Sequence, residues 1–137
     1  MEVLVTVVIV GILATIAVPS YQNYILRNNR ATVKRVLTDL ATKQEAQFLR
    51  ARQYASSLQT LVSSDAAAAT ELWVESSGKL RSSTNTDSRY KVTLTCTANA
   101  LGTNPCVSFS LQADAINAQA RDSSCARLTL TSIGGRT

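Results

Sequence analysis

Residues 3–26 limit what this chain can fold into more than any other segment, because none of them carries a charge. The part from 3 to 18, VLVTVVIVGILATIAV, is apolar on every side of a helix rather than along one stripe. Such a helix belongs in a lipid bilayer or in the interior of an assembly. At about 1.5 Å rise per residue the uncharged run would be roughly 36 Å long, enough to cross a bilayer core of about 30 Å. We therefore predict a hydrophobic membrane or assembly helix over residues 1–24.

Three residues of this helix are unusual for a simple anchor. Glu2 places a carboxylate at its head, where lipid disfavours a charge unless a cation meets it. The next charge in the chain is Arg27, so we expect the partner of Glu2 to come from another molecule. Gly11 weakens a helix by about 1 kcal/mol relative to alanine, and Pro19 removes a backbone hydrogen bond. We predict that residues 11–19 bend or unwind most easily; an ordinary membrane helix with a proline kink is the simpler alternative.

A cleaved secretory signal is a further alternative, but such signals begin with a basic segment and this chain begins with Met and Glu. Residues 1–24 instead resemble the N-terminus of a mature type IV pilin. The features that carry the resemblance are the glutamate, the apolar run, the glycine, the proline and the motif YQNY at 21–24. With the basic helix that follows, the chain is most similar to the PilE-like pilins and minor pilins.

The resemblance implies the pilin fold and a structural role. In it, Glu2 neutralises the N-terminal amine of a neighbouring subunit, and residues 11–19 lose helicity on assembly. Pilins begin with a basic leader, a cleavage glycine and a methylated phenylalanine; we expect that the sequence lacks these and that Met1 is an internal methionine. The implied partners are prepilin peptidase, the pilus assembly machinery and other subunits. The implied location is the bacterial inner membrane, with the C-terminal domain periplasmic, and then an extracellular homo-oligomeric or mixed filament.

Residues 25–54 contain no glycine or proline and are predicted to continue the helix as a basic, amphipathic segment. This segment carries the whole net charge of +5 of the chain. Its cations either form a solvated face or contact acidic groups of neighbouring subunits or anionic lipid near the membrane exit. Apolar residues recur at three- and four-residue spacings and form a stripe that we expect to pack on a sheet: Val33, Val36, Leu37, Leu40, Ala41 and Phe48.

Three later segments alternate apolar and polar residues, as half-buried strands do. They are 89–96 through Val92, Leu94 and Cys96, 106–113 through Val107, Phe109, Leu111 and Ala113, and 126–133 through Leu128 and Leu130. Residues 55–88 read as a connecting region with loop-like stretches at 63–64, 66–69, 76–78 and 82–85 and a candidate short strand at 72–74. Residues 89–137 are then an antiparallel sheet with a disulfide loop, and the fold class is α+β.

The chain has three cysteines. Cys96 and Cys106 bracket a short loop between adjacent strands, so we predict a disulfide there that contributes roughly 3 kcal/mol. The partner of Cys125 lies either beyond Thr137, because pilins of this kind close a C-terminal loop by a disulfide, or among the other two cysteines. The turn-like ending at 133–135 suits the first alternative. Basic residues after a membrane helix usually mark the cytoplasmic side, but a disulfide indicates an oxidising compartment, and we follow the disulfide.

Our first functional interpretation is a structural subunit of a type IV pilus that serves adhesion, motility or DNA uptake. An alternative is a DNA-binding pilin for natural transformation. Its DNA contacts would be a basic cluster of four residues, Lys79, Arg81, Arg89 and Lys91, in which Asp87 is the one acidic residue. Arg121 and Arg127 could join this cluster.

The sequence bears on two other classes of protein. A type II secretion pseudopilin shares the N-terminal motif. An enzyme is not expected, because the chain has no histidine and shows no nucleophile–base pair, carboxylate pair or phosphate-binding glycine loop. Three cysteines without histidine or a CxxC spacing make a poor zinc site, and we expect neither metal nor cofactor.

Overall fold

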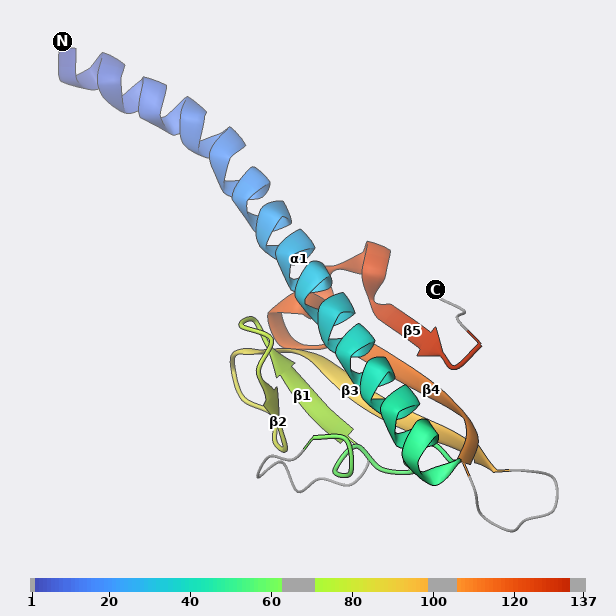
Figure 1. Ribbon diagram of the computed structural model, residues 1–137. Helices are drawn as coiled ribbons and strands as arrows, with labels where there is room; N and C mark the ends of the chain where they lie inside the picture. The colour runs from blue at the N-terminus through green and yellow to red at the C-terminus, as the bar shows by residue number, and fades with distance from the viewer. Residues whose placement is uncertain (1, 63–70, 99–105, 134–137) are drawn as a thin grey trace.

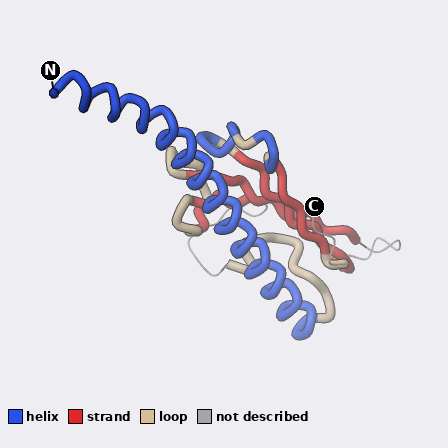
Figure 2. The backbone as a smooth tube through the Cα atoms, turned by 90° about the horizontal axis from the view of Figure 1, so that it is seen from above, coloured by secondary structure: helices blue, strands red, loops and turns tan. Residues whose placement is uncertain are grey.

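The computed structural model describes residues 2–62, 71–98 and 106–133. One long helix, α1 (Glu2–Ala51), lies with its second half on one face of an antiparallel sheet, and its first half projects away from the domain (Figure 1). Seen from above, the projecting half extends clear of the strands while the second half runs beside them (Figure 2). This is the α+β arrangement of a long helix on a sheet that the sequence predicts.

Helix α1 runs unbroken through Pro19 for 50 residues. Every described residue up to position 25 is exposed, so the domain covers none of the apolar run. The helix ends at Ala51 rather than at the predicted residue 54, because Arg52 takes a left-handed conformation with φ 57°. The buried amide of Gln44 then holds the returning chain through two hydrogen bonds with the backbone of Ala55, of 2.8 and 3.0 Å.

The sheet has five antiparallel strands in the order β2-β1-β3-β4-β5. The three strands predicted near the C-terminus are present, and the short strand predicted at 72–74 is β1. Two elements within the expected connecting region, β1 and β2, therefore belong to the sheet. The bounds are β1 (Glu71–Glu75), β2 (Leu80–Arg81), β3 (Ser88–Ala98), β4 (Cys106–Ala115) and β5 (Arg127–Thr131), with two unpredicted 3₁₀ helices, η1 (Asn117–Arg121) and η2 (Ser123–Cys125).

The core lies between α1 and the sheet. Four residues of the predicted helical stripe are buried, Val33, Val36, Leu37 and Leu40, while Ala41 is partly buried against them. Phe48, also partly buried, stacks on Tyr54 with ring centroids 4.8 Å apart. From the sheet, alternate residues face the helix: Leu72, Val74, Tyr90, Val92, Leu94, Phe109, Leu111, Ala113 and Leu128.

The predicted alternation fails at one place. Val107 was expected to face the core but is 48 % exposed, whereas Cys106 is buried. A register irregularity between Thr97 and Ala98 explains the difference, because it shifts the pairing of β3 with the start of β4 by one residue. The predicted loops at 63–64 and 66–69 and the turn at 134–135 lie outside the described residues.

Candidate nucleic-acid interface

The face of the sheet opposite α1, here called the open face, carries the polar residues of each strand. Residues paired directly across neighbouring strands lie on the same face of a sheet. A single cross-strand row therefore crosses all five strands on the open face, in the order Arg81, Trp73, Lys91, Asp114 and Arg127. The row brings three cations and the one tryptophan of the chain together from segments far apart in sequence.

Each cation of the cross-strand row has a carboxylate partner. Arg81 pairs with Glu75, Lys91 Nζ lies 2.7 Å from Glu71 Oε1, and Arg127 Nε lies 2.6 Å from Asp114 Oδ1. From the sequence, Asp87 was the one carboxylate expected to neutralise part of the basic cluster. The ion pairs of Glu75 and Glu71 correct that expectation. Both belong to β1, which reaches the cluster only through strand pairing.

Arg89, the neighbour of Lys91 along β3, is also engaged. Its Nη2 donates to Asp87 Oδ1 at 3.0 Å and its Nη1 donates to the backbone oxygen of Thr86 at 2.9 Å. Asp87 in turn accepts from the hydroxyl of Ser76 at 2.9 Å. Arg89 is therefore held against the loop between β2 and β3.

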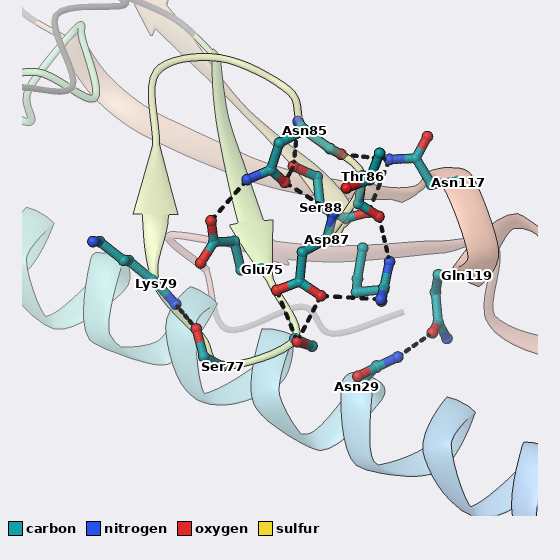
Figure 3. Close-up of polar contacts among 12 residues, drawn as sticks. Asn29, Glu75, Ser77, Lys79, Asn85, Thr86, Asp87, Ser88, Asn117 and Gln119 are labelled. Carbon is teal, nitrogen blue, oxygen red and sulfur yellow. Dashed lines mark hydrogen bonds and ion pairs between the residues drawn. The ribbon is translucent and has the colours of Figure 1, made fainter.

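Asn85 organises that loop (Figure 3). Its side-chain oxygen accepts from the Ser88 hydroxyl at 2.8 Å and from the Asp87 backbone N–H at 3.1 Å, and its Nδ2 donates to Glu75 at 2.9 Å. Hydrogen bonds from Arg81 and then from Asn85 lower the pKa of Glu75. The side chain of Asn117 in η1 donates to the backbone oxygens of Asn85 and Ser88, both at 3.0 Å. The basic cluster thus rests on a fixed loop.

Lys79 differs from the other predicted contacts, because it forms no ion pair with any residue that the structure describes. It follows Gly78, whose φ of 87° makes the turn between β1 and β2. A Cβ at Gly78 would lie 3.1 Å from Thr32 Cγ2 and 3.3 Å from Arg35 Nη2, so this turn sits directly on α1. Arg35 is a neighbour of the cluster that the sequence could not reveal, since the contact joins residues on different elements.

The two further basic residues of the prediction, Arg121 and Arg127, lie in different places. Arg127 joins the cross-strand row, whereas Arg121 is exposed on η1 and donates to the backbone oxygen of Ala118. On the open face, four cations (Arg81, Arg89, Lys91, Arg127) meet four carboxylates (Glu71, Glu75, Asp87, Asp114), as the strand pairing and ion pairs place them. The open face is rich in charge but has little net charge, and the surplus lies at Lys79 and Arg35 beside it.

A buried polar junction, which the sequence did not predict, joins α1 to η1 and η2. Asn29 Nδ2 donates to Gln119 Oε1 at 2.9 Å, and Gln119 Nε2 donates to Asp122 Oδ2 at 3.0 Å and to the Tyr90 hydroxyl at 3.1 Å. Arg30 binds both carboxylate oxygens of Asp122, and these hydrogen bonds are the main cause that lowers the pKa of Asp122. Burial raises the pKa of Tyr90 to about 12.

The predicted assembly residues all lie on the projecting half of α1, away from the domain. Glu2 and Pro19 are exposed, and a Cβ at Gly11 would meet nothing within 4 Å. The projecting half is long and apolar enough to cross a membrane, and none of that stretch is buried in the molecule. The roles of these three residues in a filament remain predictions.

The cysteines resolve one of the open alternatives. Cys96 and Cys106 form the predicted disulfide, with Cα atoms 5.6 Å apart, and Cys125 is a half-buried free thiol. Pairing of Cys125 with either of the other two is therefore excluded.

Comparison with known protein families places most of this chain in one of them. Residues 19–129 match a family described as the type IV minor pilin ComP, a DNA uptake sequence receptor. Neither the curated proteins nor the solved structures give a match. The family match spans the second half of α1, strands β1 to β4 and the buried polar junction, which is well over half of the chain. The chain therefore belongs to this family of type IV minor pilins.

Proposed function

We propose that this chain is a DNA-binding minor pilin, held in the membrane by α1 before it enters a type IV pilus. The observation that carries the proposal is the match of residues 19–129 to a family of DNA uptake sequence receptors. DNA binding, the second interpretation of the sequence, thereby becomes a principal role. The same match favours a pilus subunit over a secretion pseudopilin. Nothing in the family description calls for catalysis, and we assign none.

The proposed DNA contacts are Lys79, Arg81, Arg89 and Lys91. Lys79 offers an exposed ammonium group, and Arg81 and Lys91 flank Trp73 in the cross-strand row. The side chains of Lys91 and Glu71 are both partly exposed. Such ion pairs contribute only about 0–1 kcal/mol, so a DNA phosphate can replace the carboxylate of Glu71 at little cost. Trp73 is half-buried and lies between the two cations in the row. It supplies an aromatic surface for DNA contact in a chain that has few aromatic residues.

The near balance of charge on the open face has a consequence for selectivity. Non-specific DNA binding depends on excess positive charge and weakens with salt. Four carboxylates among four cations reduce that attraction, so useful affinity must include contacts with base edges, which carry the sequence information. We therefore expect weak binding to arbitrary DNA and a preference for particular duplex sequences.

The test is DNA binding by the full chain in nanodiscs of neutral lipid, followed by fluorescence anisotropy of labelled duplex DNA over a salt series. The variant Lys79→Gln/Lys91→Gln should bind more weakly, and the slope of log affinity against log salt should fall by about 2. The matched control, Arg50→Gln/Arg52→Gln, removes two exposed cations at and just beyond the far end of α1 and should leave the slope unchanged. Equal binding by wild type and the first variant would refute these contacts.

The filament role rests on residues of the projecting helix. In the proposed assembly, Glu2 meets the N-terminal amine of a neighbouring subunit, and residues 11–19 lose helicity as the subunit leaves the membrane. Repetition of such an interface without closure produces an open fibre. Prepilin peptidase and the pilus assembly machinery are the proposed processing partners, with the C-terminal domain in the periplasm before export.

Antibodies against residues 55–137 test the filament role on intact cells. Sparse or tip labelling of filaments is expected for a minor subunit, and the label should disappear in Glu2→Ala cells but not in Glu45→Ala cells. Glu45 is an exposed carboxylate of the same helix, outside the apolar run. Normal labelling with Glu2→Ala would contradict the assembly role.

A further inference from the structure

Arg27, Lys34 and Arg35 are exposed cations of α1, and none of them forms an ion pair with a residue in the described ranges. Arg50, at the far end of the helix, is a fourth such cation. Other cations of the same helix are engaged, since Arg30 binds Asp122 and Lys43 lies 3.0 Å from Asp39. Arg27, Lys34 and Arg35 are the unpaired cations that follow the uncharged run 3–26.

Arg27 and Lys34 lie on the side of the helix that faces away from the sheet, here called the exit face. Arg35 lies at the edge of this face, with its Nη2 beside the turn at Gly78. At 100° per residue, positions 27, 31, 34, 35 and 38 cluster on the side opposite the buried Val33, Leu37 and Leu40. Ala31 and Thr38 are exposed, as this placement requires. The exit face and the open face of the sheet are thus opposite sides of a two-layer domain.

The apolar run fixes the height of these cations above a bilayer. If Leu26 lies at the edge of the hydrocarbon core, Arg27 begins the headgroup layer and Arg35 lies about 14 Å along the helix axis from Leu26. Long basic side chains reach back towards phosphates, and the screening length at physiological salt is about 8 Å. Tyr21 and Tyr24, 66 % and 68 % exposed, lie at the level where aromatic residues favour the membrane interface.

We propose that the exit face binds the anionic headgroups of phospholipids while the subunit is in the membrane. The headgroup phosphates supply the negative charge that the described chain does not, and the apolar run delivers the exit face to them. Binding on this side tilts α1 so that its exit face turns towards the membrane surface. The open face of the sheet then points away from the membrane. The inference concerns membrane anchoring and stands whether or not the open face binds DNA.

The test places a nitroxide label on the exit face of the full chain, as Ala31→Cys in a Cys125→Ser background. Vesicles of phosphatidylcholine alone are compared with vesicles that also contain phosphatidylglycerol, and the collision rate with a neutral, water-soluble nickel chelate is measured. With phosphatidylglycerol the collision rate should fall by about twofold or more, and high salt should restore it. A label at Thr38→Cys repeats the measurement should the first site perturb folding.

Two variants make the result specific. Arg27→Gln/Lys34→Gln/Arg35→Gln should abolish the effect of phosphatidylglycerol, whereas Arg50→Gln/Arg52→Gln should retain it. A collision rate equal in both vesicles would overturn the proposal, as would a lipid effect that survives the triple substitution. Protection in neutral vesicles accompanied by spin–spin broadening would mean that a second copy covers the exit face, which also overturns it.

Discussion

Asn29 and Gln119, 90 residues apart in sequence, are joined by a buried amide–amide hydrogen bond of 2.9 Å. Gln119 also donates to the backbone oxygen of Leu26, at 3.4 Å. Every described residue before Leu26 is exposed. This hydrogen bond therefore closes the domain onto the helix at the point where the helix leaves it, and the domain's hold on α1 begins there.

Removal of Gln119 should loosen this junction. Gln119→Ala strands buried groups of Asn29 and Tyr90, and each unsatisfied polar group costs about 1–3 kcal/mol, so we expect a loss of about 3 kcal/mol in the free energy of unfolding. Urea denaturation of the full chain in detergent, followed by Trp73 fluorescence, measures it. Gln59→Ala, at an exposed position, should change little. Equal losses in the two variants would contradict a specific role for the junction.

The pair of Arg30 and Asp122 should make stability depend on acid. The pKa of Asp122 in the folded chain lies below its unfolded value of about 3.9. The ionised carboxylate therefore stabilises the fold above about pH 3.9, and this stabilisation is lost as pH falls through the folded pKa. Asp122→Asn should lose about 2–3 kcal/mol at neutral pH, with the difference from wild type shrinking in acid. Asp39→Asn, which removes an exposed pair with Lys43, should cost at most about 0.5 kcal/mol. A pH-independent difference for Asp122→Asn would count against the ion pair.

Tyr90 should ionise late. Burial raises its pKa to about 12, against about 10 in an unfolded chain. The neutral phenol is favoured by folding, so stability falls as pH rises above about 10. Ultraviolet titration of phenolate should show a step near pH 12 that is lost in Tyr90→Phe, while Tyr24→Phe at an exposed position should retain it. A folded wild-type chain without a late step would contradict the buried environment.

The disulfide should stabilise the sheet by closing the connection between β3 and β4. The double substitution Cys96→Ser/Cys106→Ser should lower the free energy of unfolding by about 3 kcal/mol, the chain-entropy value for a loop of this size. Cys125→Ser should have a small effect, since that thiol is free. Urea denaturation with and without reductant measures both. A wild-type chain insensitive to reductant, with the thiols shown to be reduced, would disprove the contribution.

Local patterns predicted the long helix, the helical stripe around Val33 and Leu40, the three C-terminal strands and the disulfide, because periodicity and spacing are properties of neighbouring residues. They could not predict β2, which has two residues and exists through its pairing with Trp73 and Val74. Val107 shows the same limit, since the pairing passes from Thr97–Ser108 to Ala98–Cys106 and leaves Val107 as the extra residue of β4.

The basic residues of the candidate interface could be predicted from the sequence, but their carboxylate partners could not. Lys79, Arg81, Arg89 and Lys91 were recognisable as a basic cluster, yet the pairing of Lys91 with Glu71 depends on the register of β1 on β3. Arg35 joins the cluster through a tertiary contact with the turn at Gly78. The burial of Asn29 and Gln119 is likewise invisible in sequence, because polar residues are normally exposed unless a distant partner satisfies them.

Selection from a pool of random duplex DNA tests the central claim most directly. The wild-type full chain in neutral nanodiscs captures duplexes through repeated rounds, and the retained pool is sequenced. We predict that one short sequence becomes enriched, and that Lys79→Gln/Lys91→Gln captures it poorly while Arg50→Gln/Arg52→Gln captures it as well as wild type. A retained pool with the composition of the starting pool, or no retention above empty nanodiscs, would contradict sequence-selective DNA binding by this pilin.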